Sequence, residues 1–182
     1  MKLRPKRISS YWRELIRVNA KEDNIPEMKD MLDPRHYKNV MRAPLEAESL
    51  PPWCYTDERF FKLEVERIFM RVWNLVGRDD LMPNPGDYLA TDVAGIPIIL
   101  IRDQNGQARA FANSCRHRAT QLLSGEGNCQ AIVCPYHHWA FALDGNLISA
   151  AGMEDTIGFD MADYGLKPLR LERWAGFLFV NF

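Results

Sequence analysis

The chain has 182 residues, a formal net charge of −1 and 47% hydrophobic residues, which is the composition of an ordinary globular protein. The balanced charge excludes a strongly basic nucleic-acid-binding surface, and no apolar run reaches the roughly 18–20 residues of a transmembrane helix. The length accommodates one domain preceded by an arm. The first twenty residues are basic, and we interpret them as a solvated arm, with an organellar presequence as the alternative.

The N-terminal third is predicted to be irregular up to a single helix. Proline recurs through residues 26–52 and interrupts any long element there. A helix is predicted to begin at residues 56–58, where a hydroxyl side chain and two acids suit a helix N-terminus. Helical spacing then places an apolar stripe on one face of this helix, which we expect to face a core: Phe61, Val65, Ile68, Phe69 and Val72.

From Trp73 onward the pattern predicts short antiparallel strands. Asn105-Gly106 and the turn at 144–146 are hairpin signals between two pairs of them. The predicted fold class is mainly β, a small antiparallel sandwich or barrel with an N-terminal helical arm. The expected strands are Asn74–Arg78, Asp87–Val93, Ile96–Arg102, Gln107–Asn113, Gln130–Cys134, Trp139–Leu143, Leu147–Ala150, Leu166–Leu171 and Gly176–Phe182.

Two short motifs carry the chemistry, a C-x-H at 115–117 and a C-x-x-H at 134–137. Each offers one thiolate and one imidazole at a spacing that a single turn can aim at a common point. A Rieske [2Fe–2S] centre needs this mixture, because two histidines replace two cysteines on one of its irons. We therefore predict one such cluster per chain, with Cys115 and Cys134 on the inner iron and His117 and His137 on the outer iron.

Zinc is the alternative reading of these four residues. Zinc also accepts two cysteines and two histidines, but zinc fingers usually place like ligands together, whereas each motif here is mixed. The adjacent His138 is expected to be a loop histidine rather than a third imidazole ligand. Cys54 and Cys129 are left over and could pair as a disulfide.

The two motifs resemble a known family. The sequences C-R-H-R-A at 115–119 and C-P-Y-H-H-W at 134–139 are similar to the Rieske loops of aromatic ring-hydroxylating oxygenase α subunits, and the resemblance covers roughly residues 40–182. One departure is His138, where the family usually has glycine. The stretch 50–78 is similar to family members that act on quaternary ammonium compounds rather than arenes.

The resemblance implies a division of the protein into parts. Residues 1–72 would form an arm and a helix that packs on a catalytic domain, and residues 73–182 would form the Rieske domain. The catalytic domain itself, C-terminal in the family, would be absent from this chain.

The resemblance also implies the function. The chain would be the electron-transfer portion of a terminal oxygenase, a mono- or dioxygenase that takes electrons from a reductase or ferredoxin. It would pass them to a mononuclear non-haem iron that activates O₂ in a neighbouring subunit of a homotrimer. Such an iron needs two histidines and a carboxylate. Only His36 and His138 remain for it, so no catalytic residue is expected here.

The alternative function is a stand-alone Rieske ferredoxin-type electron carrier. The long arm and the helix before Trp73 argue against it. Iron–sulfur chemistry without a secretory signal favours a reducing cytoplasm. Neither a nucleic acid nor a membrane is expected as a partner.

The residues beside the motifs predict a low reduction potential. High-potential Rieske proteins carry a disulfide beside the cluster, and Thr120 and Tyr136 stand at the positions of its cysteines. They also place a serine where this chain has Trp139, and that hydroxyl donates a hydrogen bond to a sulfide. The single N–H of Trp139 is less expected to reach a sulfide. Fewer donors to the sulfurs leave the reduced cluster less stabilised.

Overall fold

The computed structural model describes residues 25–182, so the basic first twenty residues lie outside the described part. The chain divides into two compact units, Met1–Glu64 and Val65–Phe182. The predicted boundary between residues 72 and 73 stays a prediction.

Short helices make up the described part of the first unit. They are η1 (Met28–Asp30), η2 (Pro34–Tyr37), α2 (Trp53–Thr56) and α3 (Glu58–Glu64). Buried Met31, Trp53 and Cys54 form a small core against which Tyr37 and Phe60 pack.

The helix start predicted at residues 56–58 is present, but the capping residue is Asp57 rather than Thr56. The Asp57 carboxylate accepts the backbone N–H of Arg59 at 2.8 Å, whereas the Thr56 hydroxyl donates to the carbonyl of Pro52. The ion pair with Arg59 lowers the pKa of Asp57 to about 2, which keeps the carboxylate charged at the positive end of the helix dipole.

The predicted apolar stripe continues past α3 into a π-helical turn, η3 (Val65–Phe69). Its side chains do not form a core within the described residues. Phe61, Ile68 and Val72 are 46%, 48% and 44% exposed. The packing of this stripe on a further domain stays a prediction.

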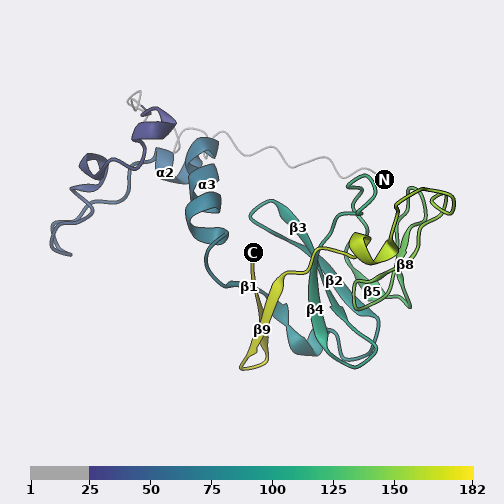
Figure 1. Cartoon of the computed structure of the whole chain (residues 1–182). Coiled ribbons are helices and arrows are strands. Elements are labelled where there is room, and N and C mark those ends of the chain that lie inside the picture. The colour runs from purple at the N-terminus through teal and green to yellow at the C-terminus, as the bar shows by residue number, and fades with distance from the viewer. Residues whose placement is uncertain (1–24) are drawn as a thin grey trace, which may run out of the picture. The chain divides into compact units, whose positions relative to one another are not determined.

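Antiparallel strands build the second unit, as predicted, and Figure 1 shows the paired strands β2, β3 and β4 at its centre. Two short 3-10 helices, η4 (Asp79–Leu81) and η5 (Met161–Tyr164), lie between strands. The strands form three sheets with the orders β1–β10–β9, β4–β3–β2–β5 and β6–β7–β8, which do not close into a barrel in residues 65–182. Their bounds are β1 Asn74–Arg78, β2 Asp87–Val93, β3 Ile96–Arg102, β4 Ala108–Ala112, β5 Glu126–Asn128, β6 Ile132–Val133, β7 Ala140–Phe141, β8 Leu147–Ser149, β9 Arg170–Trp174 and β10 Phe177–Asn181.

One predicted strand is displaced in the structure, one strand was not predicted, and the ends of five others differ from the predicted bounds by one or two residues. β9 begins at Arg170 rather than Leu166, because Leu166 instead turns into the core and Pro168 makes only an isolated bridge to Phe111. The sequence does not predict β5, since its residues Glu-Gly-Asn have no apolar alternation; the strand pairs with β2 through the backbone and through the Asn128 side chain, which donates to the Asp87 carboxylate at 2.8 Å.

β3 separates two hydrophobic cores. Successive side chains on a strand point to opposite faces, and both faces of this strand are buried. Ile98 and Leu100 join a core with β10, whereas Ile99 and Ile101 join the core that contains both motif cysteines. The motif loops are therefore anchored on the most deeply buried strand of the unit.

Candidate metal centre

The two predicted motifs lie on loops with the same backbone geometry. In the first loop the N–H of Cys115 donates to the carbonyl of Thr120 at 2.8 Å, and the N–H of Ala119 donates back to the carbonyl of Cys115 at 2.9 Å. The loop at Cys134 repeats both bonds at the equivalent positions, at 2.8 and 3.1 Å. Each cysteine therefore sits in a turn that is closed by two main-chain hydrogen bonds.

Each turn also contains one left-handed residue. Ala119 has φ 56° and His138 has φ 58°, and both stand four positions after the motif cysteine. The left-handed region is the one that glycine adopts without cost. This geometry suits the glycine that is usual in the family at position 138, and His138 is an exposed loop residue, as predicted.

The loops bring the two motif cysteines together in the core. Cys115 is 4% exposed and Cys134 is 1% exposed, and both belong to the same hydrophobic core. Burial raises the pKa of the Cys115 thiol above its ordinary value, the N–H of His117 opposes this, and the Cys134 thiol adds to the rise. Two thiolates at this depth need a positively charged metal to hold them.

The two motif histidines also meet, nearer the surface. The rings of His117 and His137 lie edge to face with centroids 4.7 Å apart, and both residues are half-buried. The Nδ1 atom of His117 is buried and has no hydrogen-bond partner within residues 25–182. Partial desolvation, followed by the charges of His117 and Arg118, lowers the pKa of His137, which favours the neutral imidazole that metals bind.

This arrangement fits a dinuclear cluster. The four donors form a buried thiol pair and an outer imidazole pair, and the buried Nδ1 of His117 has no other partner in the part of the chain that the structure describes. A zinc tetrahedron needs all four donors on one ion, whereas each iron of a Rieske cluster takes two.

A family model for the Rieske [2Fe-2S] domain matches residues 72–162. The chain belongs to this family. The match contains both motif loops, so a [2Fe–2S] cluster is the cofactor of this domain.

Curated proteins with similar sequences are oxygenase subunits. The chain is 42% identical to the carnitine monooxygenase oxygenase subunit of Escherichia coli K12 over 145 residues, which are 79% of this chain and 39% of that protein. It is 37% identical to the glycine betaine monooxygenase oxygenase subunit of Pseudomonas aeruginosa PAO1, over 79% of this chain and 33% of that protein. The chloroplastic choline monooxygenase of Arabidopsis thaliana is 37% identical over 77% of this chain and 33% of that protein. The chain thus spans less than half the length of these relatives.

Solved structures show the same Rieske architecture. A quaternary ammonium Rieske monooxygenase in complex with L-carnitine superposes with a TM-score of 0.70 at 39% identity, over 74% of this chain and 39% of that chain. The F352V mutant of naphthalene 1,2-dioxygenase, bound to phenanthrene, gives 0.66 at 37% identity, over 70% of this chain and 30% of that one.

Residues that the sequence did not single out support the Rieske loops. The buried Asn113, at the end of β4, accepts the N–H groups of Leu122 and Leu123 at 2.9 and 3.0 Å and donates to the carbonyl of Leu123 at 2.8 Å. Its side chain therefore ties the two ends of the first motif loop together. An amide residue at a strand end just before a ligand is the signal available in the sequence.

The remaining candidates lie away from the Rieske loops or make other contacts. His36 contacts Trp53 edge-on in the first unit. Cys54 and Cys129 are both free thiols, so the disulfide that the sequence left open does not form. No helix in the described part of the chain is long and apolar enough to cross a membrane.

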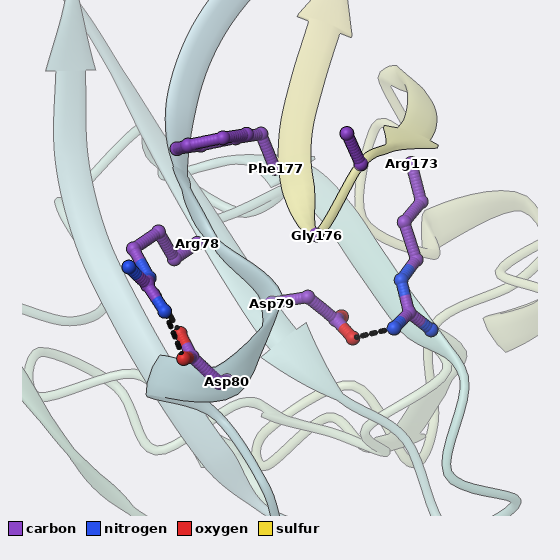
Figure 2. A pocket seen from close by; sticks show the side chains of 7 residues that line it. Arg78, Asp79, Asp80, Arg173, Gly176 and Phe177 are labelled. Carbon is purple, nitrogen blue, oxygen red and sulfur yellow. Dashed lines mark hydrogen bonds and ion pairs between the residues drawn. The ribbon is translucent and has the colours of Figure 1, made fainter.

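A shallow pocket of about 200 Å³ lies beside the turn between β9 and β10. Figure 2 shows its charged groups engaged with one another, Arg78 with Asp80 and Asp79 with Arg173. Asp79 also pairs with Arg102 at 2.8 Å. These ion pairs stabilise the end of the sheet. Because the acidic and basic side chains neutralise each other, the pocket offers little to a charged ligand.

Proposed function

We propose that this chain is the electron-transfer portion of a terminal oxygenase, and that Cys115, His117, Cys134 and His137 bind its [2Fe–2S] cluster. The observation that supports the ligand set is the depth gradient across the site. The thiol pair lies in the core, whereas the imidazole pair is half-buried. The cysteines would hold the inner iron and the histidines the outer one.

The cluster supplies one-electron chemistry, and the chain's own residues orient it. The closed turns hold the two thiols side by side, and the core around them excludes water. His117 and His137 offer the route by which an electron reaches the surface, since they are the ligands nearest to it. Arg118, exposed beside His117, adds positive charge to this face and would favour an acidic electron donor.

The electron acceptor is proposed to lie outside this chain. The four proposed ligands use two of the four histidines, which leaves His36 in the proline-rich arm and His138 beside a proposed ligand. These two are not at helical spacing with a carboxylate, whereas a mononuclear iron needs two histidines and a carboxylate together. A reductase or ferredoxin would supply the electrons. The structure of a similar quaternary ammonium Rieske monooxygenase is described in terms of inter-subunit electron transfer, which supports an acceptor iron in a neighbouring subunit. We propose that this assembly is a homotrimer.

The substrate of the whole protein is proposed to be a quaternary ammonium compound. The similar proteins named above act on carnitine, glycine betaine and choline, and the quaternary ammonium structure superposes better than the naphthalene one. Free cysteines and an iron–sulfur cluster support a reducing compartment such as the cytoplasm.

Two measurements test this proposal. The reconstituted chain should contain two irons and two sulfides and give a Rieske-type EPR signal on reduction; stoichiometric zinc without iron would overturn it. The whole protein, with a reductase and dioxygen, should consume carnitine, choline or glycine betaine and leave naphthalene unchanged. Turnover of naphthalene alone would refute the substrate class, and a protein that transfers electrons without any oxygenation would be a stand-alone carrier.

A further inference from the structure

Buried side-chain atoms without a hydrogen-bond partner are concentrated at the proposed cluster site. Four such N or O atoms occur in residues 25–182, and three of them belong to the motif loops: Arg116 Nε, His117 Nδ1 and Trp139 Nε1. A buried polar group that is left unpaired costs about 1–3 kcal/mol. His117 Nδ1 is accounted for as an iron ligand, which leaves two N–H donors.

Trp139 is the better placed of these donors. Its indole is 1% exposed and stacks on the imidazole of His117, with ring centroids 4.8 Å apart and an interplanar angle of 7°. An N–H bond lies in the plane of its ring, so the indole N–H runs alongside the ligand ring rather than into it. Phe159 and Tyr164 meet the indole edge to face, at 5.6 and 5.8 Å.

Within residues 25–182 the indole N–H has no hydrogen-bond partner, and the two motif thiols are no exception, so its acceptor would have to come with the cluster. The ring faces of Phe159 and Tyr164 are weak acceptors for an N–H. Sulfides and thiolates carry negative charge, and a hydrogen bond to a charged acceptor contributes about 1.5–3 kcal/mol. The comparison with high-potential Rieske proteins predicts no donor at position 139, but the burial of this N–H gives it no alternative partner.

We propose that Trp139 is a positioning residue of the cluster: its indole holds the plane of the His117 imidazole, and its Nε1–H donates a hydrogen bond to a sulfide of the cluster. The proposal rests on the ligand set of the proposed function. The bond is stronger when the cluster carries its extra electron, so Trp139 raises the reduction potential.

The substitution Trp139→Phe keeps an aromatic ring on His117 and removes only the N–H. In an EPR-monitored redox titration of the loaded chain, the ratio of reduced to oxidised cluster at a fixed potential should fall about tenfold. For a one-electron couple this is a midpoint lower by about 59 mV. An unchanged midpoint would overturn the donor role.

Two further variants separate the hydrogen bond from the packing. Phe159→Leu alters a neighbour that touches Trp139 without a ring contact to His117, so its midpoint should match the wild type. An equal shift in this control would assign the effect to packing and refute the proposal. Trp139→Leu removes the ring that stacks on His117, so it should change the ¹⁴N hyperfine couplings of the ligand histidines. Trp139→Phe should preserve these couplings. Wild-type couplings in Trp139→Leu would refute the stacking role.

A measurement on the unmutated chain covers the case in which the variants fail to bind a cluster. In the reduced wild-type chain labelled with [¹⁵N-indole]tryptophan, pulsed EPR should resolve a weak ¹⁵N coupling transmitted through the hydrogen bond. Its absence would overturn the donor role. A Rieske EPR signal in the same sample confirms the cluster independently, so failure of this inference is distinguishable from failure of the proposed function.

Discussion

The backbone N–H of Leu122 donates to the side-chain oxygen of Asn113 across a buried distance of 2.9 Å. This bond joins β4 to the far end of the first motif loop. Leu123 makes two more bonds to the same amide. The position of His117 therefore depends on a residue that cannot itself bind iron in this arrangement.

Asn113→Ala should destabilise the loaded chain by about 2–4 kcal/mol, because it removes three hydrogen bonds and leaves a buried N–H unpaired. Thermal unfolding followed by bleaching of the cluster would measure this. Asn146→Ala is the matched control, since this exposed hairpin amide bonds only Asp144 through its side chain, and it should cost less than about 1 kcal/mol. Equal effects of the two variants would contradict the role of Asn113.

The four cysteines should respond differently to substitution. Cys134→Ser should abolish the cluster, because it replaces one member of the buried thiol pair. Cys54→Ser and Cys129→Ser should retain it, since Cys54 packs against Trp53 in the other unit and Cys129 is a free thiol outside both motifs. Iron and sulfide analysis together with EPR shows whether each variant retains the cluster. An intact spectrum in Cys134→Ser would remove the ligand assignment.

His138→Gly should stabilise the second loop without loss of the cluster. A non-glycine residue at φ 58° pays about 1–2 kcal/mol of backbone strain, part of which is offset by the greater freedom of glycine in the unfolded chain. We expect a net gain of about 0.5–1 kcal/mol in thermal unfolding. Ala119→Gly, at φ 56°, should give a similar gain. Cluster loss in His138→Gly would show that the imidazole has a role at the site.

The reduction potential should lie near the low end of the Rieske range, closer to about −150 mV than to +300 mV. Thr120 and Tyr136 cannot form the disulfide that accompanies high-potential clusters. The hydrogen bond proposed for Trp139 adds one donor but does not replace that bridge. A redox titration near neutral pH measures the midpoint, and a value above about +100 mV would contradict both the tuning argument and the oxygenase assignment.

Strong periodic patterns were predictable from the sequence, and features that depend on tertiary contacts were not. β1, β2 and β3 have the predicted bounds because each has a clear apolar pattern between turn residues. β5 carries no such pattern. Leu166 is apolar because its side chain packs in the core, and it does not belong to a strand.

The same contrast holds at the site. The spacing of the four proposed ligands indicates the cluster chemistry, because these residues come from two short motifs. The stack of Trp139 on His117 and the bonds of Asn113 join segments that only the folded chain brings together. Residue spacing therefore could not reveal them.

The two motif turns, closed by equivalent hydrogen bonds, have a consequence for the speed of electron transfer. Each is locked by its own main chain at both ends, from Cys115 to Thr120 and from Cys134 to Trp139. A site whose ligands are held independently of the cluster changes shape little between its oxidised and reduced states. We therefore expect a small reorganisation energy, so that an electron can pass through His117 or His137 without waiting for the protein to rearrange.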